Sequence, residues 1–323
     1  MTQAGARNMQ GQTQKLDDQP VLKTARIVVM LATFNGAGWI GKVLEGYRQQ
    51  RGADFPWALV VVDNGSTDAT ADILARYADT LPLIVVQEMR PGKNAALNRG
   101  LELAALADSC DYIFTDDDAV PAPDFLAAWA KALADRPGHA LFGGTVRPCF
   151  AGIDQSVSRQ YAHWHPEIYA VNERPEGDIP PGAIFGPNMA VSGDLIRAGF
   201  RFNEAIGPSS ADPAYPMGSE TEFCVRVARE ADVRCWFAPE PSVQHIIRPN
   251  QATEAFILAR AYRHGRGCAT KDGPVSMGPA HAIKERLLIV RFTVGGLLGR
   301  TEARWNAAWH RGFRAGLHDE RVS

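Results

Sequence analysis

Residues 111–121 read DYIFTDDDAVP, an apolar run that ends abruptly in three adjacent carboxylates. The run is typical of a buried strand, and Asp116, Asp117 and Asp118 follow at its carboxyl end. In open α/β sheets, ligands bind at that end of the strands. Neighbouring carboxylates repel one another, so the cluster favours a bound cation that lowers the repulsion. The alternative is a solvated loop, or an acidic cap for the helix that begins near Asp124.

Three earlier apolar runs show the same arrangement. Each has strand length and ends in small or polar residues, and a segment with helical spacing follows each one. The runs are Ile27–Ala32, Ala58–Val62 and Leu83–Val86. Continuous apolar strands that alternate with helices are typical of a largely parallel sheet with right-handed crossovers. We therefore expect an α/β fold in which four strand ends meet at one crevice.

The phosphate-binding loops of two other α/β folds do not occur in this sequence. No GxGxxG follows the first apolar run, and neither GxxxxGKS nor GxxxxGKT is present. A dinucleotide-binding Rossmann domain and a P-loop domain both need such a glycine-rich turn to approach phosphate. The sequence therefore argues against both of these classes.

Charge balance and cysteine usage narrow the partners and the compartment. The chain holds 34 Lys and Arg against 36 Asp and Glu, so no overall field points to nucleic acid. Its five cysteines show no metal-binding spacing, and an odd number favours reduced thiols in the cytoplasm. The apolar run Leu287–Gly299 contains Arg291 and is too short to span a bilayer. We expect a cytoplasmic protein, peripheral at the inner face of the cell membrane at most.

Composition divides the chain into three parts. Residues 1–24 are polar and lack periodicity, which predicts a flexible N-terminal tail. Residues 25–250 hold the α/β pattern of a single domain. Residues 251–323 are basic and have helical spacing, which predicts a helical C-terminal extension. Within the middle part, residues 207–217 are rich in Pro, Ser and Ala and favour a lid over the crevice.

Six short motifs occur in a consistent order between residues 26 and 248. They are TFN at 33–35, VVDNGSTD at 61–68, GKNAALNRG at 92–100, TDDD at 115–118, GPNMA at 186–190 and GSETEF at 218–223. Together they resemble the family 2 nucleotide-sugar glycosyltransferases, because all six appear in order and at intervals typical of such enzymes. The resemblance implies the GT-A fold, a Rossmann-like mixed, mostly parallel sheet flanked by helices.

The resemblance implies a binding site for a nucleoside-diphosphate sugar donor. Its donor-binding residues would be Thr33, Asn35, Asp63, Lys93, Asp116 and Asn188. Asp63 would accept a hydrogen bond from a uracil or guanine N–H, although the same sequence also favours an ordinary turn. Lys93, in the loop before a helix, would hold the diphosphate, and Asp116 would contact the ribose. Asn188 would face the donor sugar from the wall beneath it.

The resemblance also implies a divalent cation beside the diphosphate. Asp117 would be the direct ligand, and Asp118 competes for this role because the family's Asp-x-Asp motif slips by a residue. His245 matches a position that contacts the metal or the phosphates, although a lone histidine is as often structural. The ion would be Mg²⁺ or Mn²⁺, both of which prefer oxygen ligands. It would stabilise the negative charge on the departing nucleoside diphosphate.

Transfer of a sugar to a hydroxyl group requires a base that accepts the hydroxyl proton. In the family an acidic residue at the start of a helix has this role, and Glu220 occupies its place here. Ser219 replaces the supporting carboxylate that usually precedes the base, and Glu222 is the alternative base. Residues two apart lie on different helix faces, so at most one of these glutamates points into the crevice. Otherwise both glutamates stabilise a helix N-terminus.

These residues imply an inverting, metal-dependent transfer to a hydroxyl of a saccharide or a lipid-linked acceptor. The expected setting is the synthesis of a cell-surface polysaccharide, and a homo-oligomer is possible. Two alternatives stay open. A non-catalytic member would bind the nucleotide sugar or a saccharide without turnover, and the departure at Ser219 is its only cue. A sugar-nucleotide pyrophosphorylase would need a basic glycine-rich loop near residues 33–38, which hold no basic residue.

Apolar residues in the last 40 or so positions allow two interpretations. Every fourth residue of one segment is large and apolar, namely Trp305, Trp309, Phe313 and Leu317. One interpretation is a pair of interfacial helices that contact an anionic bilayer near a lipid-linked acceptor. The other is a helix packed on the main domain or on a dimer partner, which is the commoner role of an apolar stripe.

Overall fold

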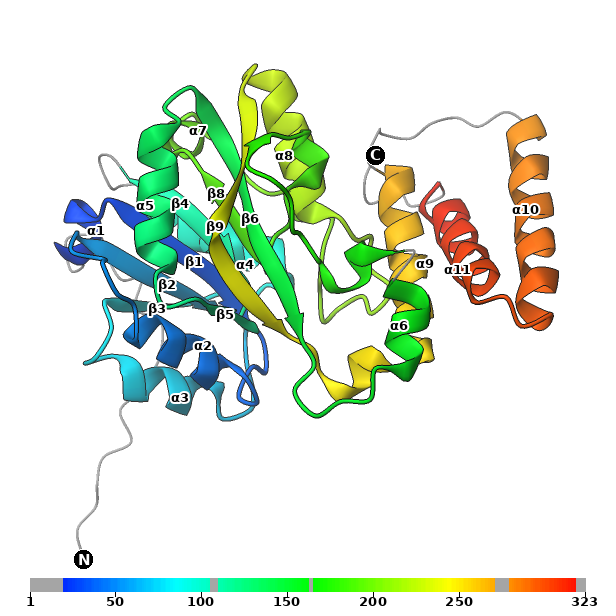
Figure 1. Cartoon of the computed structure of the whole chain (residues 1–323), viewed down its shortest axis with the longest axis horizontal. Coiled ribbons are helices and arrows are strands. Elements are labelled where there is room, and N and C mark those ends of the chain that lie inside the picture. The colour runs from blue at the N-terminus through cyan, green and yellow to red at the C-terminus, as the bar shows by residue number, and fades with distance from the viewer. Residues whose placement is uncertain (1–19, 105–109, 163–164, 271–278, 318–323) are drawn as a thin grey trace, which may run out of the picture.

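A nine-stranded mixed sheet forms the centre of the computed structural model, which describes residues 20–104, 110–162, 165–270 and 279–317 (Figure 1). Eight strands follow one another across the sheet in the order β3-β2-β1-β4-β8-β6-β9-β5, and the short strand β7 pairs with β9. The change from parallel to antiparallel pairing at β4 divides the sheet into two halves. The predicted α/β class and the mixed, GT-A-like sheet are both confirmed.

The first half of the sheet is parallel, as the continuous apolar runs predict. Its strands are β1 (Ile27–Thr33), β2 (Trp57–Asp63), β3 (Leu83–Gln87) and β4 (Asp111–Thr115). The register pairs Thr33 with Asp63 and Asp63 with Gln87. The carboxyl ends of these strands therefore meet at one edge, and the triplet follows directly from β4.

The second half of the sheet is mainly antiparallel to its neighbours. Its strands are β5 (Ala119–Pro121), β6 (His139–Cys149), β7 (Gly177–Asp178), β8 (Asn188–Val191) and β9 (Arg234–Ile246). Strand β8 runs antiparallel to both β4 and β6, whereas β6 and β9 are parallel. Strand β5 pairs with the end of β9 and sets Ala119 opposite His245. This pairing joins the triplet to a segment more than a hundred residues away.

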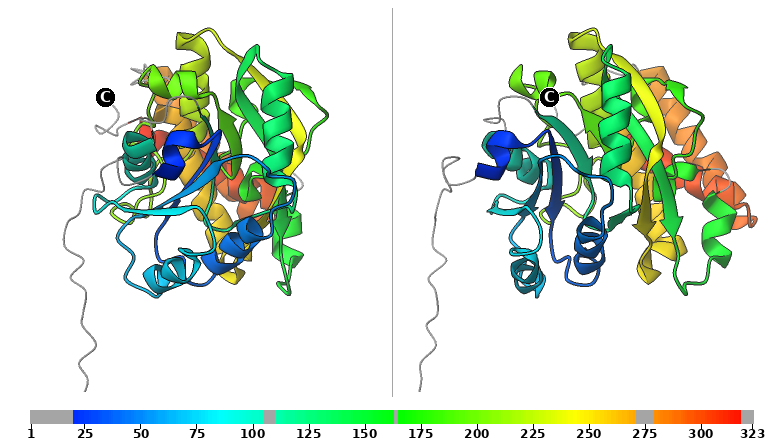
Figure 2. Two further views of the ribbon diagram at one scale, coloured as in Figure 1. Left: turned by 90° about the vertical axis from the view of Figure 1, so that its left-hand side faces the viewer. Right: turned by 60° about the vertical axis from the view of Figure 1, so that its left-hand side comes forward.

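Helices cover both faces of the sheet (Figure 2). One face packs against α2 (Ile40–Arg48), α3 (Thr70–Tyr77) and α5 (Phe125–Asp135). The other packs against α1 (Pro20–Thr24), α4 (Lys93–Ala104), α7 (Gly193–Arg197) and α8 (Ser219–Glu230). Alternate residues of β1 serve the two cores, with Val29 in the first and Val28 in the second. Burial on both sides explains why the strand is apolar throughout.

The ordered domain begins before the boundary that composition suggests. Residues 20–24 form helix α1, and its Leu22 is fully buried in the core beneath β1. Val21 and Ala25 pack against the same core, and a segment this short leaves no readable periodicity in the sequence. The rest of the expected tail, residues 1–19, lies outside the described residues.

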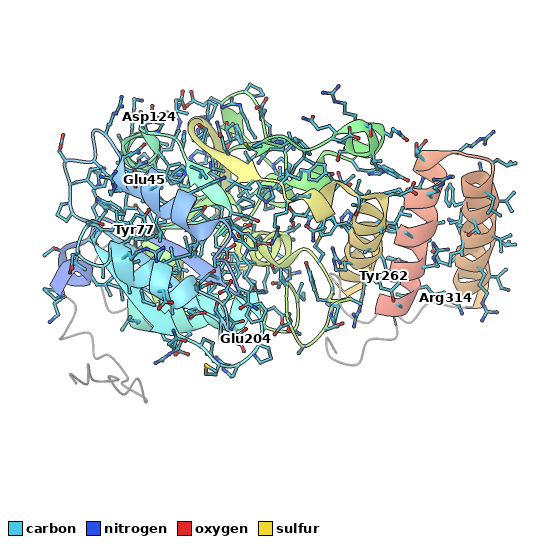
Figure 3. All side chains as sticks on the ribbon, turned by 90° about the horizontal axis from the view of Figure 1, so that it is seen from below. Glu45, Tyr77, Asp124, Glu204, Tyr262 and Arg314 are labelled. Carbon is cyan, nitrogen blue, oxygen red and sulfur yellow. The ribbon has the colours of Figure 1, made fainter. Side chains whose placement is uncertain are left out.

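The C-terminal part is helical, as predicted. Its long helices are α9 (Glu254–Thr270), α10 (Pro279–Leu297) and α11 (Thr301–Gly316), and α6 (Ser156–Ala162) packs beside them. Short 3₁₀ turns occur at Pro166–Tyr169, Pro181–Ala183 and Pro249–Ala252. Helix α11 lies between α9 and α10 (Figure 3). Within the described ranges, no helix is both long and apolar enough to cross a membrane.

Small residues allow α9 and α11 to approach closely. A side chain at Gly265 would stand 2.0 Å from the Trp309 carbonyl oxygen, and one at Gly312 would stand 1.8 Å from that of Tyr262. Trp305 is 2% exposed in a third core cluster with residues of α9 and α6. The apolar stripe of α11 therefore packs on the protein itself.

Candidate functional site

A cavity of about 810 Å³ opens at the carboxyl ends of β1 and β4. The carboxylate triplet forms its floor, the loop at 207–217 and the start of α8 form one side, and α9 forms the other. Its volume lies within the range of sites that hold a cofactor-sized ligand. Seven of the predicted site residues with ionisable side chains line it together: Lys93, Asp116, Asp117, Asp118, Glu220, Glu222 and His245.

Asp117 contacts the end of β1. It accepts a hydrogen bond from the Thr33 hydroxyl at 2.6 Å. Burial, followed by the charges of Asp118 and Asp116, raises the pKa of Asp117 to about 7. Gly36 makes this contact possible, because a side chain there would come within 2.4 Å of the Thr33 hydroxyl oxygen. Burial and the two neighbouring carboxylates thus disfavour the charged form of Asp117.

Asp118 differs from its neighbour because two cationic groups face it. The His245 Nε2 lies 3.4 Å from one carboxylate oxygen, and the Arg248 guanidinium lies 3.5 Å from the other. Burial acts to raise the pKa of Asp118, but these two groups outweigh it and lower the pKa. His245 is fixed by its Nδ1, 2.9 Å from the Tyr169 carbonyl oxygen. In this geometry His245 is a partner of Asp118, and its expected contact with a metal or with phosphates stays a prediction.

Lys93 joins the triplet to the candidate base. Its ammonium donates to Asp116 at 2.6 Å and to Glu220 at 2.7 Å. Burial disfavours the ammonium charge, yet the two carboxylates raise the pKa of Lys93. Burial would likewise raise the pKa of Glu220, but Lys93 outweighs it and lowers that pKa to about 2. Lys93 is the first residue of helix α4, and not a loop residue as the sequence suggested.

The two candidate bases lie in different environments on α8. Glu220 points toward Gly186, where a side chain would come within 2.3 Å of its carboxylate. Ser219, which replaces the usual supporting carboxylate, donates its hydroxyl to Glu220 at 2.9 Å. Glu222 also borders the cavity, but it pairs at 2.6 Å with Arg226 one turn further along the helix. The structure thus presents Glu220 to the centre of the site.

Asn35 and Asp63 hold loops behind the cavity and do not line it. Asp63 is 3% exposed, and it accepts hydrogen bonds from the Ser66 backbone N–H at 2.9 Å and the Gln87 amide at 3.1 Å. The Asn35 side chain accepts from the Thr67 backbone N–H at 2.8 Å. Both residues therefore set the shape of the turns after β1 and β2.

Asn188, which the sequence suggested as a contact for the donor sugar, does not line the cavity. Its side chain is fully buried at the start of β8. The amide oxygen accepts from the Trp129 indole at 3.1 Å, and the amide nitrogen donates to the carbonyls of Thr145 and Pro241, each at 2.9 Å. These bonds tie β8 to the neighbouring strands and to α5. An amide side chain is needed at this position because it satisfies two buried carbonyl groups and a buried indole N–H. The local sequence does not show that these groups lie nearby.

Several cationic residues of the site went unnoticed in the sequence. Arg248 pairs with Asp118 and lies over the Trp39 ring at 4.5 Å. Arg260 and Arg263 of α9 also line the cavity. The pKa of Arg260 is lowered, mainly because its guanidinium is buried. Residues three apart share a helix face, so the spacing of Arg260 and Arg263 already indicated one cationic face of a helix. Only the packing of α9 shows that this face borders the cavity.

The loop at 207–217, which the sequence suggests is a lid, is bonded at both ends. The Lys93 backbone N–H donates to the Pro208 carbonyl at 2.8 Å, and the Met217 N–H donates to the Arg263 carbonyl at 3.0 Å. Between these points the Arg266 guanidinium pairs with Asp212 at 2.9 Å. The loop thus connects the two walls of the cavity.

Comparison with known protein families decides the identity. A family model described as Glycosyl transferase family 2 matches residues 28–195, just over half of the 323-residue chain. This chain belongs to glycosyl transferase family 2. The matched region of the transferase runs from β1 to α7 and includes the triplet and Lys93.

Named relatives agree with this family. Glycosyltransferase AglE of Haloferax volcanii is 22% identical over 240 residues, which cover 68% of the transferase and 77% of that protein. A PGL/p-HBAD biosynthesis glycosyltransferase of Mycobacterium bovis is 31% identical over 121 residues. That match covers 36% of the transferase and 46% of the relative, which is less than half of its length. The transferase is thus a member of an enzyme family with named glycosyltransferases.

Solved structures share the fold of the transferase. Mannosyltransferase PcManGT from Pyrobaculum calidifontis, in complex with GDP-Man and Mn²⁺, aligns with a TM-score of 0.60 at 21% identity. That alignment covers 92% of the transferase and 88% of PcManGT. S. aureus TarS 1-349 in complex with UDP aligns at 0.51 and 16% identity, over 90% of each chain. Together with the family match, these neighbours confirm the GT-A fold.

Proposed function

We propose that the transferase moves a sugar from a nucleoside-diphosphate sugar to a hydroxyl group of a saccharide or lipid-linked acceptor, with inversion at the anomeric carbon. The observation that carries this proposal is one cavity in which Lys93 stands between the carboxylate Asp116 and the buried base candidate Glu220. The arrangement offers a cation for the departing diphosphate and a base for the entering hydroxyl at one place. A structural neighbour in complex with GDP-Man and Mn²⁺ supports the choice of donor class.

For the donor we assign the ribose to Asp116 and the diphosphate to Lys93. Thr33 and Asn64 border the cavity at the ends of β1 and β2, where a nucleobase would reach the turns held by Asn35 and Asp63. A uracil or guanine edge needs hydrogen-bond acceptors and backbone groups, which these turns provide. The choice of base therefore depends on the loop shape that Asn35 and Asp63 maintain.

The triplet has the chemistry that a divalent cation requires. Among the described residues, no three His, Cys, Asp or Glu side chains converge closely enough to hold an ion by themselves. Mg²⁺ and Mn²⁺ at nucleotide sites are commonly held by one or two carboxylates, with phosphates and water supplying the rest. We assign this role to Asp117, whose raised pKa marks an incompletely compensated charge, with Asp118 and His245 beside it. The bound ion would stabilise the charge of the nucleoside diphosphate as it leaves.

Glu220 is the proposed general base. The acceptor oxygen bonds to the anomeric carbon while the bond to the diphosphate breaks, and the hydroxyl proton passes to the Glu220 carboxylate. While paired with Lys93, Glu220 is a weak base, because its pKa is lowered to about 2. An incoming diphosphate competes for the Lys93 ammonium. Donor binding would then raise the basicity of Glu220 and let Lys93 stabilise the leaving group.

The proposed setting is the cytoplasm, at a pathway that builds cell-surface polysaccharide. All five cysteines are free thiols, in keeping with a reducing compartment. We assign no nucleic-acid partner, since the charges nearly balance at 34 basic and 36 acidic residues. A homo-oligomer fits this setting as well as a monomer does.

Titration calorimetry with UDP and GDP, with and without Mn²⁺, tests the donor site. We expect one nucleotide to bind in a metal-dependent manner to the wild type and to lose this dependence in Asp117→Ala. The variant Glu220→Gln should retain that binding and lose turnover, and Glu222→Gln should keep both. Metal-independent binding would contradict the site. Binding without any turnover of the wild type would favour the non-catalytic alternative.

A further inference from the structure

Exposed apolar side chains are concentrated on one helix. In the part of the chain that the structure describes, six of the eight large hydrophobic residues found exposed belong to α10 or to the turn after it. Their exposed fractions range from 51% to 82%. They are Ile283, Leu287, Val290, Val294, Leu297 and Leu298. We call these six residues the α10 stripe.

The α10 stripe occupies one face of its helix. From Ile283 to Leu297 the spacing alternates between four and three residues. That interval keeps side chains on the same side of an α-helix. The stripe is thus a continuous apolar surface, and an exposed surface of this kind marks a site of interaction.

The opposite face of α10 is already occupied by α11. Glu285 is 5% exposed and pairs with His310 at 2.7 Å, and the Phe292 ring stacks on His310 at 5.4 Å. A side chain at Gly295 would come within 2.9 Å of the Ala303 side chain. Helix α10 is the outermost of the three C-terminal helices (Figures 1 and 3), so the stripe faces away from the protein.

Positive charges border the α10 stripe. Lys284, Arg286 and Arg291 are exposed beside it, and Arg300 is exposed at its end. Glu285 is the single acidic residue between positions 283 and 300, and it is turned toward α11. The exposed surface around the stripe is therefore apolar in the centre and cationic at the edges.

This charge pattern decides between two occupants of the stripe. If a second copy packed its α10 against this one, residues that flank the two stripes would face each other, and all of the charged ones are cationic. Like charges in those positions disfavour pairing. An anionic lipid surface instead attracts each of the same side chains. Basic flanks around an exposed apolar face are typical of helices that lie in the plane of a membrane interface.

We propose that α10 is a peripheral membrane anchor that lies flat on a bilayer with anionic head groups. The α10 stripe enters the boundary between head groups and acyl chains, and Lys284, Arg286 and Arg291 contact lipid phosphates. Helix α11 connects this surface to α9, which lines the cavity with Arg260 and Arg263. If the proposed transfer to a lipid-linked acceptor holds, the anchor brings the cavity to the surface where that acceptor lies.

Vesicle flotation of the full chain, without donor or acceptor, tests the anchor. We expect binding to vesicles of equal parts phosphatidylcholine and phosphatidylglycerol, and little binding to phosphatidylcholine alone. High salt should weaken the binding. The double variant R286Q/R291Q should weaken it roughly 30-fold, since each cation contributes about fivefold near an anionic surface. L287E/V294E should abolish it.

Met89→Ser is the matched control, because Met89 is 76% exposed and lies outside α10. It should bind vesicles like the wild type. Circular dichroism checks whether L287E/V294E is folded. Because R286Q/R291Q alters only exposed charges, this variant tests the proposal even if L287E/V294E misfolds. Equal binding to both lipid mixtures, or unchanged binding by R286Q/R291Q, overturns the proposal. So does a dimer in light scattering that L287E/V294E dissociates, with no vesicle binding by the wild type.

These outcomes are independent of the catalytic proposal. Flotation needs no turnover, and transfer to a water-soluble acceptor should be unchanged in R286Q/R291Q. If the transferase binds vesicles but shows no turnover, the membrane anchor is supported and the proposed function is contradicted. If it shows turnover but does not bind vesicles, the proposed function is supported and the anchor is contradicted.

Discussion

Lys93 controls the protonation of the candidate base, and it does so through a single ammonium group shared between Asp116 and Glu220. Both carboxylates come from distant parts of the chain, one after β4 and one on α8. Because burial alone would favour the neutral acid, the ionised state of Glu220 depends on this contact. We therefore expect the Lys93 contact to set the pH range in which Glu220 can accept a proton.

Lys93→Met should move the acidic limb of the pH dependence of kcat/KM to higher pH. In the wild type the pKa of Glu220 is lowered to about 2, so the carboxylate is ionised throughout the usual range. Without the ammonium, burial raises that pKa, and the base is ionised only at higher pH. Lys131→Met, at an exposed ion pair on α5, should leave the profile unchanged. An unshifted limb in Lys93→Met would contradict Glu220 as the base.

Gly36→Ala should weaken metal-dependent nucleotide binding. The new methyl group would lie 2.4 Å from the Thr33 hydroxyl and 2.7 Å from the Asp117 carboxylate, so one of them must move. Overpacking of this kind costs about 1–3 kcal/mol, which corresponds to roughly a 5- to 150-fold loss of affinity if it falls on binding. Calorimetry with Mn²⁺ and nucleotide measures this loss. Gly38→Ala is the control, since nothing lies within 4 Å of a side chain there, and equal affinities would contradict the argument.

Asn188→Ala should lower the free energy of unfolding by roughly 3 kcal/mol. The change leaves three buried groups without a partner, and each costs about 1–3 kcal/mol before relaxation. They are the Trp129 indole, the Thr145 carbonyl and the Pro241 carbonyl. Urea denaturation measures the loss, and nucleotide affinity should change little in the folded variant. A stable variant with a large loss of donor affinity would instead restore Asn188 as a donor contact.

Among the elements, the contact of α9 with α11 holds one wall of the cavity in place. Helix α9 presents Arg260 and Arg263 to the cavity, while its other side packs against α11 through small residues. The backbones approach closely at Gly265 and Gly312, so α11 supports this wall of the cavity. The C-terminal extension is therefore part of the site.

Gly312→Ala should destabilise the transferase and raise KM for its substrates. A side chain at this position would stand 1.8 Å from the Tyr262 carbonyl, which requires the two helices to separate. We expect a loss of about 1–3 kcal/mol in the free energy of unfolding, measured by denaturation. Gly138→Ala serves as the comparison because a side chain there contacts nothing within 4 Å. If both variants are equally stable, the packing does not carry this role.

For the whole molecule, metal and nucleotide should stabilise the fold only together. The described residues provide no complete cage for an ion, so Mn²⁺ alone should leave the melting temperature nearly unchanged. Nucleotide and Mn²⁺ at 100 times their dissociation constant should add about 2.7 kcal/mol to the free energy of unfolding. Thermal melts of the wild type and Asp117→Ala compare the two cases. A rise with Mn²⁺ alone would indicate a site complete without phosphate.

Much of the sheet could be predicted from the sequence because most strands of its parallel half are buried on both faces. Strands β1, β2 and β4 are of this kind, and the edge strand β3 is still a short apolar run, so all four stand out in the sequence with their ends correct to within a residue or two. Strand β9 contains two prolines, and β5, β7 and β8 are short, so no such run marked them. In the turn after β2, Asp68 accepts a hydrogen bond from the Thr70 N–H at the start of α3, a contact that the sequence pattern did not indicate.

The α/β class, the parallel half of the sheet and the place of the triplet at the end of β4 could all be predicted from the order of residues. These follow from local apolar runs, whose burial the residue types already dictate. Three other features became visible only in the folded protein: Lys93 bridges Asp116 and Glu220, Asn188 is internal, and α10 leaves its stripe uncovered. The physical reason is that burial and charge pairing depend on groups brought together by folding from distant parts of the chain, and residue order does not record those distances.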